Sequence, residues 1–106
     1  MDKKPKDLTW MGDSLEVLQA LSKPVKKQIG VELRRVQNGI EPSNWKPMKS
    51  VGKGVREIRV LSDGEFRVIY VVIKRGSVFV LHAFQKKSQR TSKQDIALAR
   101  KRLRDI

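Results

Sequence analysis

Apolar residues in the first third of the chain recur every three or four positions, a spacing that predicts helices. A short strand is expected over 8–11. A first helix is expected over 13–21, capped by Asp13, with Glu16 three residues later completing a capping box. A second helix is predicted to start at Ser22–Pro24 and to end at Gly39. The apolar faces of the two helices consist of Leu15, Leu18, Leu21, Val25, Ile29, Leu33 and Val36.

After Trp45 the spacing becomes that of extended chain. Asp63-Gly64 is a strong hairpin signal, and turns are also expected at 52–54 and 75–76. The segment over 66–74 is apolar on both faces, which is typical of a central strand. Strands are thus predicted over 46–51, 55–61, 66–74 and 77–84.

Ser92 is expected to cap a last helix, because Ile96, Ala99, Leu103 and Ile106 then form one apolar stripe. The order of elements predicts an α+β domain, with an antiparallel meander of about four strands after two helices. With 106 residues, of which 39% are hydrophobic, we expect one domain over 1–106.

The chain is strongly basic, with 24 Lys and Arg against 11 Asp and Glu and a net charge of +13. Such a charge favours nucleic acid as the partner, ahead of an anionic membrane or an acidic protein. No apolar run approaches the roughly 20 residues of a membrane span, so no membrane partner is expected. The absence of cysteine excludes disulfides and thiol catalysis. No apolar signal-peptide core is evident near the start, and we expect a cytoplasmic protein.

A cationic loop follows the last predicted strand and contains no carboxylate. A cluster of this kind has no use in packing, and its expected partner is a polyanion. The interpretation is one wall of an RNA-cleaving site. The polar and basic residues of this segment are His82, Gln85, Lys86, Lys87, Gln89 and Arg90.

Other chemistries fit the sequence poorly. A metal-dependent nuclease needs converging carboxylates, whereas the acidic residues here are scattered singly, so no metal and no cofactor are expected. No nucleophile-elbow pattern accompanies His82, and the glycines at 52 and 54 lack the spacing of a phosphate-binding loop. Trp10 and Trp45 are too distant in sequence to indicate a base-stacking platform.

Metal-free RNA cleavage remains, in which the RNA supplies its own 2′-OH nucleophile. Arg59, Arg67, Lys86 and Lys87 lie near strand ends where they could converge on a phosphate, and His82 is a second candidate for proton transfer. Simpler roles stay open for each. Arg67 could be a structural arginine paired with Glu57 or Glu65, His82 a packing residue, and the lysines ordinary loop charges. Further candidates for contacts with RNA or the ribosome are Lys53, Gln89, Arg90, Lys93 and Arg100.

At these residues the chain resembles the RelE/ParE toxin superfamily, and within it the phage-associated HigB-type branch. The matching segments are WMGDSLEVLQALSKPVKKQIG, KPMKSVGKGVREIRV, GEFRVIYV and VLHAFQKKSQRT followed by DI, and together they span roughly 10–102. The most specific of these is VLHAFQKK with the downstream DI.

The resemblance implies a RelE-like fold, with two N-terminal helices packed on a small twisted antiparallel sheet and a C-terminal helix. It implies the toxin of a type II toxin–antitoxin pair that cuts mRNA on the ribosome without metal. Arg59, Arg67 and Lys86 match basic positions of the family's site, and His82 and Lys87 belong to the branch's own motif. The implied partners are a HigA-like antitoxin with a helix-turn-helix, the ribosome and mRNA, and operator DNA only through the antitoxin complex.

The chain departs from RelE at two positions: a tyrosine is missing near Ser92, and Glu57 stands where RelE has a lysine. Either Lys86 or His82 transfers the proton, or the activity is altered. Two other functions remain open. One is a ParE-like toxin that binds and poisons DNA gyrase, and the other is an RNA-binding domain without catalysis.

Overall fold

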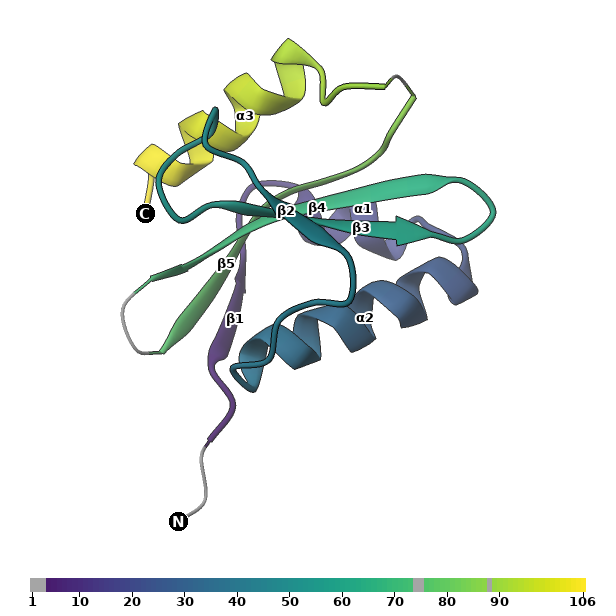
Figure 1. Ribbon diagram of the computed structural model, residues 1–106, viewed down its shortest axis with the longest axis horizontal. Helices are drawn as coiled ribbons and strands as arrows, with labels where there is room; N and C mark the ends of the chain where they lie inside the picture. The colour runs from purple at the N-terminus through teal and green to yellow at the C-terminus, as the bar shows by residue number, and fades with distance from the viewer. Residues whose placement is uncertain (1–3, 74–75, 88) are drawn as a thin grey trace.

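The computed structural model describes residues 4–73, 76–87 and 89–106. One sheet carries helices on both of its faces (Figure 1). The turn predicted at 75–76 involves Arg75, which lies outside the described residues. In chain order the elements are β1 (Asp7–Trp10), α1 (Ser14–Gln19), α2 (Lys23–Gln37), β2 (Trp45–Pro47), β3 (Arg56–Leu61), β4 (Glu65–Ile73), β5 (Ser77–Gln85) and α3 (Lys93–Arg104).

The sheet has five strands in the order β1-β5-β4-β3-β2. The antiparallel meander from β2 to β5 was predicted, and β4 is the central strand as its apolar pattern indicated. The short first strand also forms, but it pairs in parallel with β5. The sheet is therefore mixed, and the antiparallel sheet that the resemblance implied is wrong for β1.

The first core lies between the sheet and α2. Ile29 and Leu33 of α2 pack in one apolar cluster with Val68 and Tyr70 of β4, and these side chains are almost fully buried. Leu18 of α1 joins the same cluster. Because side chains alternate along a strand, Ile58 and Val60 of β3 face this core while Glu57 and Arg59 face the other side.

The second core lies on the opposite face, under α3. Ala99 of α3 packs with Ile69 and Val71 of β4 and with Met48 from the loop after β2. Ile96 and Leu103 complete the stripe that predicted this helix. Ile106 lies beyond the end of α3 and the residue is 45% exposed, so its place in the stripe was wrong.

A β-bulge interrupts the pairing of β4 and β5, where the register shifts between Ile69 and Tyr70. Tyr70 pairs with Val80 and Ile69 with His82, so Leu81 is the extra residue of β5. The bulge places Leu81 in the second core and directs His82 toward α3.

Two local predictions are corrected by tertiary contacts. Asp13 stands at the N-cap of α1, but its side chain makes no capping hydrogen bond and instead accepts one from Arg102. The strand predicted over 46–51 shortens to Trp45–Pro47, because Met48 and Val51 turn away to bury their side chains under α3. No helix in the described part of the chain is long and apolar enough to cross a membrane.

Candidate functional site

Three of the predicted site residues meet near one end of the sheet, on the face that carries α3. Arg59 of β3 and Arg67 of β4 are direct cross-strand partners, and Arg67 is in turn paired with Phe84 of β5. The backbone N–H of Lys86 donates to the carbonyl of Glu65 at 2.7 Å, which fixes Lys86 beside the start of β4. Arg59, Arg67 and Lys86, here called the cationic cluster, therefore converge as the sequence indicated.

A buried carboxylate lies next to this cluster. The Glu57 side chain is 0% exposed, and its Oε1 lies 3.2 Å from Arg67 Nε and 3.8 Å from Lys46 Nζ. The Thr91 hydroxyl donates to Glu57 Oε2 at 2.7 Å, which holds Thr91, shortly before the start of α3, against β3. Glu57 thus links three neighbouring segments of chain through one charge.

Arg67 makes the structural contacts that the sequence had left as its simpler role. Its side chain is 1% exposed, and Nη2 lies 3.2 Å from Glu65 Oε2 in addition to the contact with Glu57. The two carboxylates differ in exposure, because the side chain of Glu65 is 43% exposed whereas that of Glu57 is fully enclosed. Arg67 is therefore held by one enclosed carboxylate and by one that is partly exposed to solvent.

The electrostatic consequence of the clustering falls on Lys86. Burial lowers the pKa of its ammonium group below 10.5, and the positive charges of Arg67, Lys46 and Arg59 lower it further, while Glu65 opposes them. Arg59 adds a second unusual group, because its Nε–H is buried without a hydrogen-bond partner among the described residues. Concentrated positive charge that is incompletely neutralised is the property expected of a phosphate-binding site.

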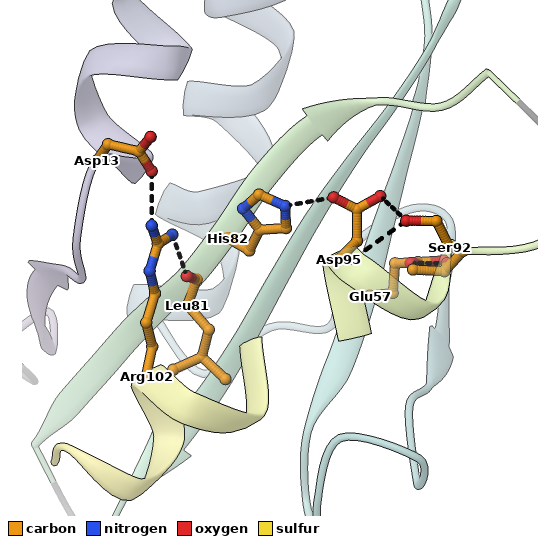
Figure 2. A network of polar contacts seen from close by, with 8 residues as sticks. Asp13, Glu57, Leu81, His82, Ser92, Asp95 and Arg102 are labelled. Carbon is orange, nitrogen blue, oxygen red and sulfur yellow. Dashed lines mark hydrogen bonds and ion pairs between the residues drawn. The ribbon is translucent and has the colours of Figure 1, made fainter. Parts of the chain in front are cut away.

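His82 lies on the same face but is committed to a different contact. Its Nε2 is 2.7 Å from Asp95 Oδ1, and its ring stacks on Phe84 with centroids 4.9 Å apart. Asp95 is itself held by Ser92, whose hydroxyl donates to Asp95 Oδ2 and accepts from the Asp95 N–H, so the predicted cap of α3 is confirmed (Figure 2). His82 has the geometry of a hydrogen-bonded packing residue, the simpler of its two predicted roles.

An ion pair fastens α3 at its other end. Arg102 Nη2 donates to Asp13 Oδ1 at 2.7 Å, and Nη1 donates to the carbonyl of Leu81 at 2.9 Å (Figure 2). The hydrogen bond from Arg102 lowers the pKa of the Asp13 carboxyl below its usual 3.8. The helix is thus tied to the sheet near both ends, at Asp95 and at Arg102.

The remaining predicted contact residues are spread over the surface. Lys87 and Gln89 line a shallow hollow together with Glu65 and Lys86, so they adjoin the cationic cluster. Arg90 is exposed in the same loop, and Lys93 and Arg100 line the outer side of α3. Lys53 lies apart from these residues, in a hollow beside Trp45 at the edge of the sheet.

Sequence reasoning gave Glu57 as one possible partner of Arg67, but it missed Lys46 and Thr91 as further partners of Glu57 and the complete burial of this carboxylate. The available signal for the burial of Glu57 was its position between apolar residues in β3. The same alternation, however, equally predicts a side chain that faces solvent. Among the described residues no group of three or more His, Cys, Asp and Glu side chains is placed to hold a metal ion.

Comparisons with known proteins place this geometry in a family. Over 97% of its length the chain is similar to a solved structure of a mutant of the E. coli toxin RelE in the free state, in which two arginines are replaced by alanine. The TM-score is 0.66, the sequence identity 18%, and 99% of that chain is covered, so the fold is RelE-like. A comparison with curated protein sequences gave no match. Residues 16–104 match the family described as "Phage derived protein Gp49-like", and the chain therefore belongs to this phage-derived Gp49-like family.

Proposed function

We propose that the protein is the toxin of a type II toxin–antitoxin pair and acts as a metal-independent endonuclease on ribosome-bound mRNA. The observation that carries the proposal is the cationic cluster of Arg59, Arg67 and Lys86 on a RelE-like fold. Cleavage by the RNA's own 2′-OH requires removal of one proton, return of another to the leaving 5′-oxygen, and stabilisation of the charge that develops on the phosphoryl group. Cations in a partly buried site supply this stabilisation of charge.

In this proposal the two arginines receive the scissile phosphate. Glu65 is the partner of Arg67 that can leave, since its side chain is 43% exposed, and a phosphate would take its place at the guanidinium. Glu57 would keep Arg67 oriented during the exchange, because it is held by Lys46 and Thr91 as well. The buried N–H of Arg59, which has no partner among the described residues, is a further donor at this place.

Lys86 is the proposed proton acceptor. Its lowered pKa increases the neutral fraction that can take a proton from the 2′-OH, and it adjoins the two arginines. His82 is less suited to this role because Asp95 occupies its Nε2 and its Nδ1 is buried. His82 is therefore assigned a positioning role, in which it holds the first turn of α3.

The proposed partners follow from the same function. An antitoxin would neutralise the cationic surface, and the HigA-like type with a helix-turn-helix remains our expectation, as does assignment to the HigB-type branch. Binding to operator DNA would occur only through the complex of toxin and antitoxin. The net charge of +13 is suited to association with ribosomal RNA and mRNA.

The decisive experiment is primer extension on a defined mRNA, with and without translating ribosomes and with a chelator present in a parallel reaction. We expect discrete cuts that require ribosomes, and a loss of at least about 100-fold in Lys86→Gln and in Arg59→Gln. Lys23→Gln is the matched control, because it removes one exposed charge at the start of α2.

Intact mRNA under all conditions would refute the proposal. Inhibition of gyrase supercoiling by the same preparation would then support the ParE-like alternative. Equal cleavage by wild type, Lys86→Gln and Lys23→Gln would instead leave an endonuclease whose site lies elsewhere.

A further inference from the structure

A second feature lies at the free edge of the sheet, away from the cationic cluster. The edge strand β2 pairs only with β3 among the described strands, and it places Trp45 and Pro47 beside Arg56. The loop that follows β2 adds Lys49 and Lys53 to form a surface hollow of about 550 Å³. This volume falls within the range of about 300–1,000 Å³ that is common for small-ligand sites.

The residues that line this hollow are mainly apolar or positively charged. It is lined by Trp45, Pro47, Gly54 and Val55 together with three cations, and no carboxylate is present among the described residues that line it. The guanidinium of Arg56 lies over one face of the Trp45 ring, 4.0 Å from its centroid, in a cation–π contact. An oriented aromatic ring surrounded by cations is the arrangement with which proteins bind unpaired nucleotides.

The edge strand itself disfavours a peptide as the occupant. Addition of a peptide strand requires a row of free backbone donors and acceptors. β2 is only three residues long, and its last residue, Pro47, has no N–H. A ligand that binds through base stacking and phosphate contacts does not depend on this edge.

Strand β2 also contributes a residue to the surroundings of the proposed cleavage site. Lys46 stands between Trp45 and Pro47, and alternation directs its side chain to the opposite face, where it lies 3.8 Å from Glu57. A single strand of RNA that passes around this edge would meet the Trp45 hollow on one side and Lys46 and the cationic cluster on the other.

We infer that Trp45 and the cations of its hollow, Lys49, Lys53 and Arg56, form a stacking subsite for one unpaired nucleotide of single-stranded RNA. The inference rests on the proposed function for the identity of the ligand, and it adds a site remote from the bond that is cut. It also gives Lys53 a specific role, as a phosphate contact next to a stacked base.

Intrinsic fluorescence provides a direct test, because the chain contains 2 tryptophans and Trp10→Phe leaves Trp45 as the single reporter. The probe is a single-stranded decauridylate, titrated at low salt into the 106-residue chain. We expect saturable quenching of Trp45 emission, since a base stacked on the indole quenches it. A decaglutamate peptide of similar charge is the control, and equal quenching by this peptide would overturn the assignment to RNA.

Binding of a fluorescein-labelled decauridylate, followed by anisotropy, tests the same subsite in variants. Trp45→Leu should weaken binding about 10-fold, the scale of one lost base–aromatic stack, whereas Trp45→Phe should weaken it less. Lys53→Gln should reduce both the affinity and its salt dependence, in contrast to Lys27→Gln on α2. Thermal melting of each variant identifies losses of RNA affinity that are caused by unfolding. If Trp45→Leu is unstable, the quenching experiment and the Trp45→Phe variant still test the subsite.

The outcomes separate this inference from the proposed function. RNA binding without a change in Trp45 emission, or equal binding by Trp45→Leu and wild type, would overturn the subsite even if ribosome-dependent cleavage is observed. Quenching of Trp45 by decauridylate in a protein that cuts no mRNA would support the subsite and refute the endonuclease.

Discussion

Replacement of Glu57 by methionine should be among the most destabilising single substitutions in the sheet. The side chains of Glu57 and Arg67 are 0% and 1% exposed, and removal of either partner leaves the other charge buried. Breaking a buried ion pair in this way typically costs about 3–5 kcal/mol. Methionine preserves most of the side-chain volume, so the loss reports the charge rather than a cavity.

The two single substitutions should not be equal. Without Arg67, the Glu57 carboxylate still accepts a hydrogen bond from Thr91 at 2.7 Å and lies 3.8 Å from Lys46, so Arg67→Met should cost about 3 kcal/mol. Without Glu57, the one carboxylate partner that Arg67 retains among the described residues is the half-exposed Glu65 at 3.2 Å, and Glu57→Met should approach about 5 kcal/mol.

The double variant Glu57→Met/Arg67→Met removes both buried charges together. The groups left behind, Thr91, Lys46 and Glu65, are partly exposed and can be hydrated. Its loss should therefore be smaller than the sum of the two single losses, with a coupling free energy of about 2–3 kcal/mol. Urea denaturation is the assay, because guanidinium would screen the charges, and tryptophan fluorescence and circular dichroism follow unfolding.

Additive losses, with a coupling below about 0.5 kcal/mol, would refute the assignment of Glu57 and Arg67 as a coupled buried pair. Thr91→Val is the matched control and should lose only about 1 kcal/mol, the value of one hydrogen bond. The double variant also separates folding from function. If it folds and cuts no mRNA, the charges serve the reaction as well as the structure.

Three further predictions concern acid stability, the cationic cluster and the glycines. Arg102 lowers the pKa of Asp13, so this pair stabilises the fold at neutral pH, and its contribution is lost as the pH falls through the lowered pKa. On acidification the urea midpoint should therefore fall less in Asp13→Asn than in the wild type. The pKa of Lys86 is lowered below 10.5, so the unfolded chain binds more protons than the folded one between the lowered pKa and 10.5. The urea midpoint of the wild type should therefore rise with pH over this range. Lys86→Gln should remove this rise without lowering the urea midpoint at neutral pH. Gly30→Ala should raise stability by about 1 kcal/mol, because the added Cβ meets nothing within 4 Å in α2, whereas Gly12→Ala should lower it, because φ is +55° and the Cβ would meet Arg102. Any of these midpoints moving the opposite way would contradict the corresponding contact.

Local patterns predicted most of the elements because each depends on spacing within a few residues. The stripe of α3, the glycine after α2 and the Asp63-Gly64 hairpin all specify local backbone, and Asp63 and Gly64 adopt positive φ values of 52° and 131°. The same patterns misplaced the side chain of Asp13 and the end of β2, where contacts with α3 outweigh local preference.

The sequence by itself determined that basic residues would gather near the end of the meander, since the hairpins bring Arg59, Arg67 and Lys86 to neighbouring strand positions. Only the tertiary structure decided which charges pair. Thr91 bonds Glu57 across 34 positions and Arg102 bonds Asp13 across 89, and no local pattern encodes such a pairing. The physical reason is that hydrogen bonds and ion pairs act over a few ångströms, so their partners are chosen by sheet register and helix packing.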